Sequence, residues 1–253
     1  MAGTDSTKET IAGGPAVILV DPQLGENIGM CARAMLNCGL TELRLVRPRD
    51  GWPNEAAVSA AAGADGILAE ARLFETTAAA VADLQRVYAT TARLRDMEKP
   101  LLTPREAAAE LRGAEVAGEG AGVLFGPERA GLVNDDVALA DGAISVPLNP
   151  AFASLNLAQS VLLIGYEWFQ AGDVALPERL SRGGTEKASK AELVNFFGRL
   201  ERALDETGFL VPVEKRPVMV RNIRNLFTRA ELTAQEVQTL HGILSALRRD
   251  ASG

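Results

Sequence analysis

Three short polar clusters contain the residues that could carry out chemistry, and each lies beside an apolar segment. The first is Asn27–Met35, where Arg33 stands between alanines in a stretch with helical periodicity. The second is Leu124–Leu132, in which Glu128 follows an apolar, strand-like run. Open parallel sheets bind ligands at the carboxyl ends of their strands, so a carboxylate in this position is a candidate functional group.

The third cluster is Val146–Gln159, in which Pro147 and Pro150 stiffen a loop before a long apolar helix. We predict that Ser154 caps this helix and that Asn156 lies in its first turn. Together, the guanidinium, carboxylate, hydroxyl and amide groups of the three clusters could orient a nucleophile and stabilise developing charge.

Each of these residues also has an ordinary structural interpretation. Arg33 could be a surface residue paired with Glu26 or Glu42, and Asn27 is well placed to cap a helix. Glu128 could be a solvated carboxylate in a tight turn. Taken one at a time, the clusters therefore leave the chemistry open.

The sequence lacks the residues that several enzyme classes require. There is no Gly-x-Ser-x-Gly segment and the single histidine, His241, lies far from the strand-rich region, which disfavours a Ser-His-Asp hydrolase. No Gly-x-x-x-x-Gly-Lys phosphate loop is present. Cys31 and Cys38 would lie about 10 Å apart along one helix, too far for a disulfide. With one distant histidine they form no metal site, so we expect no bound metal.

Strand-like runs alternate with helical stretches over the first two thirds of the chain, which predicts an α/β fold with a mainly parallel sheet and helices on both faces. The predicted strands are Ala16–Val20, Leu43–Val46, Val87–Thr91, Gly122–Phe125 and Ala143–Val146. The predicted helices of this part are Asn27–Cys38, a helix that a Thr103–Glu106 capping box begins, and Leu155–Gln170.

The pattern predicts four regions. Residues 1–14 form a flexible tail, residues 15–172 the α/β domain and residues 173–189 a linker rich in glycine and charge. Residues 190–253 form a small all-helical domain. Its predicted apolar stripes consist of Leu193, Phe196, Phe197, Leu200 and Leu204, and of Val237, Leu240, Leu244 and Leu247.

The net charge of the 253-residue chain is −7, which is unusual for a nucleic-acid-binding protein. Two basic clusters stand out locally, although charge alone favours a solvated helix face and a charged loop. They comprise Lys215, Arg216, Arg221, Arg224 and Arg229, and Arg93, Arg95, Lys99 and Arg105. No apolar run is long enough for a membrane span or a signal peptide, so we expect a cytoplasmic protein without membrane contact.

Together the clusters resemble the three signature motifs of the SpoU-type branch of the SPOUT RNA methyltransferases. The motifs read Asn-x-Gly-x-x-Ala-Arg-Ala-Met from Asn27, Phe-Gly-x-Glu-Arg-x-Gly-Leu from Phe125, and Pro-x-Asn-Pro-x-Phe-x-Ser-Leu-Asn-Leu-Ala from Pro147. The resemblance is greatest to the TrmJ-type tRNA methyltransferases. It includes Thr90–Arg93 and the C-terminal segment Arg224–Ala230, and covers nearly the whole chain after Ala16.

The resemblance implies an α/β domain with a C-terminal trefoil knot, a homodimer and S-adenosylmethionine as cofactor. It further implies methylation of a ribose 2′-hydroxyl in RNA, namely that of a cytidine or uridine in a tRNA anticodon loop. The implied catalytic residues are Asn27, Arg33, Glu128, Ser154 and Asn156. The implied cofactor-binding residues are Thr90, Thr91, Ala92, Gly126, Val146, Ala153, Ser154, Leu155 and Asn156. The expected RNA-binding residues are Arg33, Arg221 and Arg224.

Members of this family are held to use the arginine that corresponds to Arg33 as a general base. Lowering a guanidinium pKa from roughly 13 to near 7 would cost about 8 kcal/mol. We therefore expect Arg33 to stay charged and to bind RNA phosphate, and we expect Glu128 to pair with Arg33 or with an incoming arginine and to hold it in line. Three alternatives stay open: an rRNA substrate, a catalytically silent RNA-binding or assembly protein on the same fold, and an unrelated nucleotide-binding enzyme.

Overall fold

A computed structural model describes residues 11–91, 98–173 and 186–250, and contains a seven-stranded sheet in which every neighbouring pair is parallel. The strand order is β3-β2-β1-β6-β4-β7-β5. The strands are β1 (Ala16–Val20), β2 (Leu43–Val46), β3 (Arg72–Phe74), β4 (Arg86–Thr90), β5 (Leu101–Leu102), β6 (Ala121–Phe125) and β7 (Gly142–Ile144). The predicted parallel α/β fold is confirmed.

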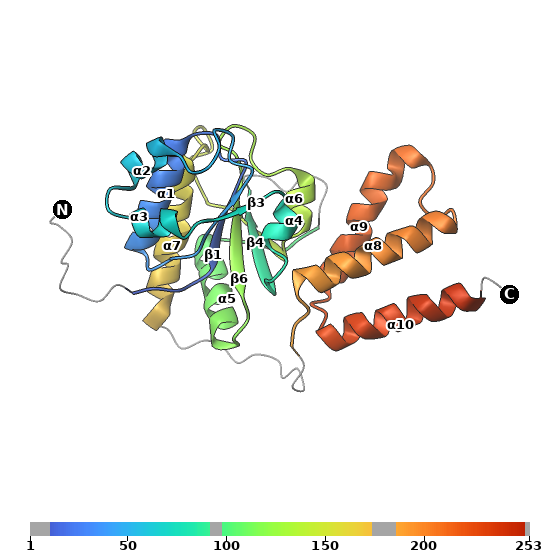
Figure 1. Ribbon diagram of the computed structural model, residues 1–253. Coiled ribbons are helices and arrows are strands. Elements are labelled where there is room, and N and C mark those ends of the chain that lie inside the picture. The colour runs from blue at the N-terminus through green and yellow to red at the C-terminus, as the bar shows by residue number, and fades with distance from the viewer. Residues whose placement is uncertain (1–10, 92–97, 174–185, 251–253) are drawn as a thin grey trace.

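Helices cover both faces of this sheet (Figure 1). Side chains of β1 alternate between the two resulting cores: Val17 and Leu19 belong to one, and Ile18 belongs to the other. The first core is covered by α1 (Gly25–Asn37), α2 (Glu55–Ala61), α3 (Asp65–Ala69), α5 (Pro104–Val116) and α7 (Leu157–Gln170). The second is covered by α4 (Thr77–Ala80) and α6 (Asn134–Ala138).

Two predicted helix caps are wrong. Helix α1 begins at Gly25, because the Leu24 carbonyl already accepts a hydrogen bond from the Asn27 amide; Asn27 therefore lies inside the helix. Helix α7 is capped by Asn156, not by Ser154. The Asn156 side chain accepts a hydrogen bond from the Ala158 amide, which starts the helix two residues later than predicted.

Other differences concern short elements and element ends. Strands β3 and β5 were not expected, because runs of three and two residues carry too little periodicity to be recognised. Strand β7 ends at Ile144, so Val146 lies in the following loop. In α7, Val161, Ile164 and Trp168 are buried, whereas Leu162 is 42% exposed.

The position of β7 bears on the predicted knot. Strand β7 lies between β4 and β5, although the chain visits β4 and β5 first. A trefoil knot requires the chain after β7 to pass through the connection from β4 to β5. Residues 92–97 of that connection lie outside the described residues, so the knot stays a prediction.

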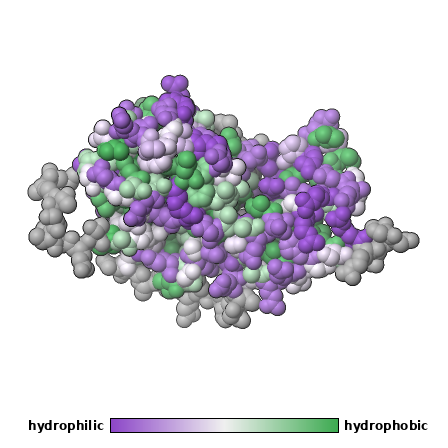
Figure 2. Space-filling model, in the orientation of Figure 1, coloured by the Kyte–Doolittle hydropathy of each residue, from purple (hydrophilic) through white to green (hydrophobic). Residues whose placement is uncertain are grey.

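The C-terminal helices α8 (Lys190–Glu206), α9 (Arg216–Arg229) and α10 (Ala234–Asp250) lie beside the α4–α6 side of the sheet (Figure 1). Phe196, Phe197 and Val237 are buried in their shared core, but Leu247 is 63% exposed. Figure 2 shows mainly hydrophilic side chains over these helices. No described helix has the length and apolar character that a bilayer span demands.

A buried ionic cluster joins the two parts at the amino ends of the strands. The Lys190 ammonium donates to Asp141 at 2.7 Å, and Lys187 lies 3.6 Å from the same carboxylate. Arg86 at the start of β4 pairs with Glu231 in the turn between α9 and α10. Burial would raise the pKa of Asp141, but the two lysines hold it below its usual value. Lys187, within the predicted linker, is thus buried against the turn between α9 and α10.

Candidate active site

A continuous set of hydrogen bonds joins the three polar clusters at the carboxyl edge of the sheet. The Asn27 side-chain amide donates to Glu128 Oε1 at 2.6 Å. The Asn156 side-chain amide donates to Asn27 Oδ1 at 3.0 Å. The backbone amide of Gln23 donates to the second Glu128 oxygen at 3.1 Å. Asn27 is therefore the central member, both donating and accepting, and we call these residues the Asn27 hub.

The fold places the hub where the strand order reverses. Asn27 follows β1, and Glu128 follows the neighbouring strand β6, while the chain connects β1 first to β2 on its other side. Ligands of open parallel sheets bind at such switch points. Asn27 is only 4% exposed, so its polar atoms require partners from the protein itself.

Two glycines allow other segments to approach Asn27 from either side. A Cβ atom on Gly29 would lie 2.1 Å from the Ala57 carbonyl oxygen, so α1 and α2 pack at backbone distance. A Cβ atom on Gly25 would lie 2.1 Å from the Asn54 side-chain oxygen, which caps α2. Packing around the helix start that carries Asn27 thus explains why both positions are glycine.

The loop that carries Glu128 is tightly folded. The Gly131 amide donates to the Pro127 carbonyl at 2.9 Å, and Gly131 has a φ of +67°, a conformation that favours glycine. A Cβ atom on Gly126 would lie 2.3 Å from the Leu132 nitrogen. Any side chain at position 126 would open this loop and move Glu128.

The expected cofactor loops follow three adjacent strands, β6, β4 and β7. The Thr90 hydroxyl donates to the Leu124 carbonyl at 2.9 Å, and the Thr91 amide donates to the Ile144 carbonyl at 3.0 Å. These bonds hold the carboxyl ends of the strands together. Because these three strands are parallel neighbours, their loops leave the sheet at the same edge. Thr90, Gly126 and Val146 are all half-buried there. Ala92 lies outside the described residues.

The segment before α7 supplies the remaining expected residues. Both polar atoms of the Asn156 side chain form hydrogen bonds. Oδ1 accepts from the Ala158 amide and caps α7, while Nδ2 donates to Asn27. Ala153 and Ser154 are exposed and Leu155 is half-buried. Ser154 forms no hydrogen bond within the described ranges, so its hydroxyl can bind another molecule.

Arg33 lies on the exposed side of α1. Among the residues that the structure describes, it has no ion-pair partner. The proposed pairing with Glu42 is wrong, because Glu42 binds Arg44 at 2.6 Å. The expected pairing of Glu128 with Arg33 is also wrong within one chain, since that carboxylate binds Asn27 and the Gln23 amide.

The basic segment around α9 is largely neutralised by carboxylates that are distant in the sequence. Arg221 lies 3.7 Å from Asp135, and Arg224 lies 2.7 Å from Glu201 and over the Phe197 ring. Arg216 and Arg229 also form ion pairs, with Asp205 and Glu98. The local excess of positive charge in the sequence therefore does not produce an unpaired basic face. Whether Arg221 and Arg224 bind RNA stays a prediction.

Neither cysteine is available for chemistry. Burial, with a smaller contribution from nearby Glu128, raises the pKa of Cys31, and burial also raises the pKa of Cys38. Both thiols are free and buried. The described part of the chain contains no group of three or more histidine, cysteine and acidic side chains that could hold a metal ion.

Sequence reasoning missed the Gln23 backbone amide as a member of the hub. A backbone donor leaves no signal in residue type, but its position three residues after the end of β1 could have pointed to it. Sequence reasoning also gave no role to the loop after β2, which lies next to Gln23 because the Arg49 amide donates to the Pro22 carbonyl at 3.1 Å.

Comparisons with known proteins agree with this geometry. The profile of the SpoU rRNA Methylase family matches residues 14–166, and that of the tRNA methyltransferase TrmJ C-terminal domain matches residues 191–253. A tRNA (cytidine/uridine-2′-O-)-methyltransferase TrmJ from Pectobacterium atrosepticum is 36% identical over 242 residues, covering 92% of this chain and 96% of that protein.

Two further relatives extend the comparison. A tRNA (cytidine/uridine/adenosine-2′-O-)-methyltransferase TrmJ from Pseudomonas aeruginosa is 38% identical, covering 94% of this chain and 95% of that protein. The crystal structure of TrmJ from Z. mobilis ZM4 superposes with a TM-score of 0.85 at 50% identity, covering 93% of this chain and all of that one. The predicted resemblance is confirmed: the chain is a methyltransferase of the SpoU family that carries the TrmJ-type C-terminal domain.

Proposed function

We propose that the protein transfers a methyl group from S-adenosylmethionine to the 2′-hydroxyl of a cytidine or uridine in the anticodon loop of tRNA. The joining of all three motifs by the Asn27 hub, beside the loops that follow β4, β6 and β7, is the observation that carries this proposal. A structure described as giving insights into 2-OH methylation of C/U34 on tRNA is 28% identical, with a TM-score of 0.50 over 61% of this chain and 93% of that one.

The C-terminal domain favours tRNA over rRNA as the substrate. The family profile that matches the α/β domain is named for rRNA methylases, so that domain alone does not select the RNA. The helical domain at residues 191–253 matches a domain defined in a tRNA methyltransferase. The relatives named above differ in whether adenosine is also accepted, and we place the pyrimidines first because both names include them.

The loops at the carboxyl edge suit S-adenosylmethionine. Thr90, Thr91, Gly126 and Val146 offer mainly backbone donors and acceptors, which match an adenine edge and a carboxylate without a charged side chain. The segment 153–156 would close the site from the other side. When bound, the cofactor supplies an activated methyl group on a sulfonium, so the chain has only to position the hydroxyl and assist loss of its proton.

The side chains divide this task between them. Asn27 and Asn156 hold the loops before α7 and after β6 in register, and Ser154 has a free hydroxyl that can orient the ribose. Arg33 keeps its positive charge, binds the RNA phosphate and stabilises the alkoxide as the proton leaves. The proton passes to the substrate phosphate or to solvent.

A homodimer would place Arg33 of one copy at the candidate active site of the other copy. Helix α7 exposes an apolar strip on the surface, and Met30 of α1, 39% exposed, lies one turn before Arg33. The strip consists of Leu162, Leu163, Tyr166 and Phe169. Apolar surface of this kind marks an interface. We infer that a second copy covers it and that the active site is completed across the interface, in the cytoplasm where tRNA is modified.

The proposed reaction can be tested with labelled S-adenosylmethionine and total tRNA, followed by nucleoside analysis. We expect 2′-O-methylated cytidine or uridine from the anticodon loop. Transfer to rRNA alone would contradict the substrate assignment, and no thermal shift with S-adenosylhomocysteine would contradict the cofactor.

Asn27→Asp should destabilise the protein by about 1–3 kcal/mol at pH 7, because two carboxylates would then face each other across a hydrogen-bond distance. The pKa of the new carboxyl would be raised in the folded state, so the lost stability should return as the pH falls. Urea unfolding between pH 4.5 and 8 measures this effect. The double variant Asn27→Asp/Glu128→Gln restores a donor and an acceptor and should recover stability; failure to recover would refute the hub.

Arg33→Lys should lower kcat about 100-fold without moving the pH optimum, because lysine keeps the charge but loses the planar fork of donors. The pH profile of single-turnover methylation measures both quantities. Full activity with an optimum that follows the lower lysine pKa would instead support a general base.

Leu163→Glu should convert the proposed dimer into a monomer and abolish methyl transfer, because a carboxylate would be buried in the apolar strip. Sedimentation equilibrium measures the mass. Ile243→Glu, at a residue 50% exposed on α10 among the C-terminal helices, is the matched control and should remain dimeric. A monomeric wild-type protein would rule the dimer out.

A further inference from the structure

Arg49 is held beside the Asn27 hub by its backbone. Its amide donates to the Pro22 carbonyl at 3.1 Å, and the next residue, Gln23, donates its own amide to Glu128 at 3.1 Å. The residue that anchors Arg49, Pro22, is therefore the immediate sequence neighbour of a member of the hub. Since β1 and β2 are parallel neighbours, both loops leave the sheet at its carboxyl edge.

The loop that carries Arg49 is fixed at its start by a two-pronged ion pair. Arg47 binds both oxygens of Asp21, at 2.9 and 2.8 Å, and donates to the Glu75 carbonyl at 3.1 Å. Arg47 and Asp21 have φ values of 45° and 46°, which non-glycine residues adopt only when their surroundings enforce it. Arg47 thereby joins the carboxyl ends of β1, β2 and β3, two residues before Arg49 in the chain.

The Arg49 side chain, in contrast, has a weak partner. It is 56% exposed and pairs at 2.9 Å with Asp50, its sequence neighbour, which is 44% exposed. The hydrogen bond that Arg49 donates to Asp50, with smaller contributions from the charges of Asp50 and Glu128, raises the pKa of Arg49. Exposed ion pairs contribute little free energy, so this guanidinium can exchange Asp50 for a stronger anionic partner.

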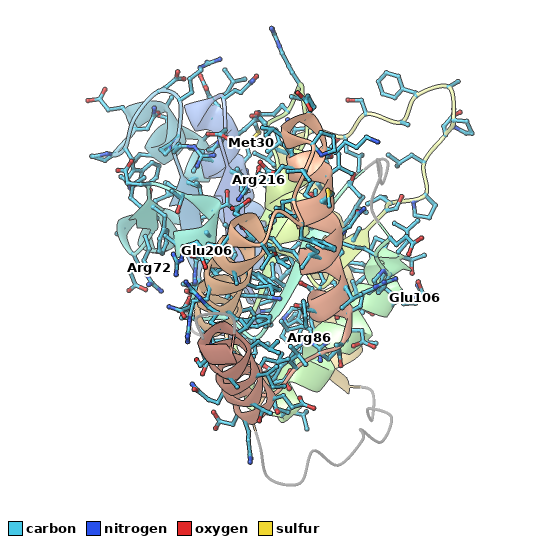
Figure 3. All side chains as sticks on the ribbon, turned by 90° about the vertical axis from the view of Figure 1, so that its right-hand side faces the viewer. Met30, Arg72, Arg86, Glu106, Glu206 and Arg216 are labelled. Carbon is cyan, nitrogen blue, oxygen red and sulfur yellow. The ribbon has the colours of Figure 1, made fainter. Side chains whose placement is uncertain are left out.

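Several other arginines are committed to ion pairs within the fold. Arg44 is buried among carboxylates, Arg47 is bound by Asp21, and Arg224 pairs with Glu201. Arg49 thus combines a fixed backbone, an exposed and permanently charged side chain, and a position next to the hub. Figure 3, seen from the side of the C-terminal helices, shows Arg86 of the amino edge below Met30 of α1.

We propose that Arg49 binds a backbone phosphate of the RNA next to the methylated nucleotide, and that Asp50 competes with this phosphate. This inference rests on the proposed function. Phosphate contacts fix the register of a nucleic acid on a protein without reading its sequence. Arg49 accordingly sets which ribose reaches the hub, and it is a substrate-binding residue of the same site.

Arg49→Gln should raise KM for tRNA about tenfold, leave kcat within about twofold, and make the plot of log KM against log salt shallower by about 0.7–1. The Kd for S-adenosylhomocysteine should not change. Arg72→Gln is the matched control, because Arg72 is 53% exposed and also ion-paired, but lies at the amino end of β3. The control should leave both KM and the salt slope unchanged.

Asp50→Asn should act in the opposite direction and lower KM about two- to threefold, since the competing carboxylate is removed. This gain should vanish in the double variant Arg49→Gln/Asp50→Asn. An unchanged KM and salt slope for Arg49→Gln, or an equal gain in the double variant, would overturn the inference. Failure of the wild-type protein to methylate tRNA would count against the proposed function instead.

Discussion

The structure depends on one buried asparagine amide that satisfies two partners at once. Asn27 donates to Glu128 and accepts from Asn156, and so joins segments that are more than 100 residues apart in the chain. Neither an acid nor an aliphatic residue could do both, because a carboxylate cannot donate and an aliphatic side chain can do neither. The glycines on either side, the tight loop at Gly131 and the late start of α7 all follow from bringing these groups together.

The long elements of the fold could be predicted because each carries several turns or a full strand of pattern. β1 and β2 begin and end at the predicted residues, and the capping box at Thr103 starts α5 as expected. Short elements such as β3 and β5 form only because neighbouring strands offer hydrogen-bond partners. The partners lie elsewhere in the chain and leave no pattern in the local sequence, so these elements could not be predicted.

The meeting of the three motifs could be predicted from the sequence, but the contacts that join them could not. The motifs placed Asn27, Glu128 and Asn156 together, yet helix-cap preferences assigned Asn27 and Ser154 to roles that the structure gives to Leu24 and Asn156. Caps are chosen by tertiary partners as well as by propensity, and Asn156 gains a second bond by capping. Likewise, the charge pattern around α9 suggested a basic face, because its neutralising partners, such as Asp135 and Glu201, are distant in sequence.

The ionic cluster around Asp141 lies at the amino edge of the sheet, opposite the edge that carries the candidate site. The amino ends of β4 and β7 hold the C-terminal helices through Arg86, Lys187 and Lys190, while the carboxyl ends of the same strands carry the loops of the site. If the helical domain selects the RNA, substitutions that change this selection would act at the amino edge and leave the proposed methyl-transfer edge intact. The same catalytic half could in this way be reused with new targeting surfaces during evolution.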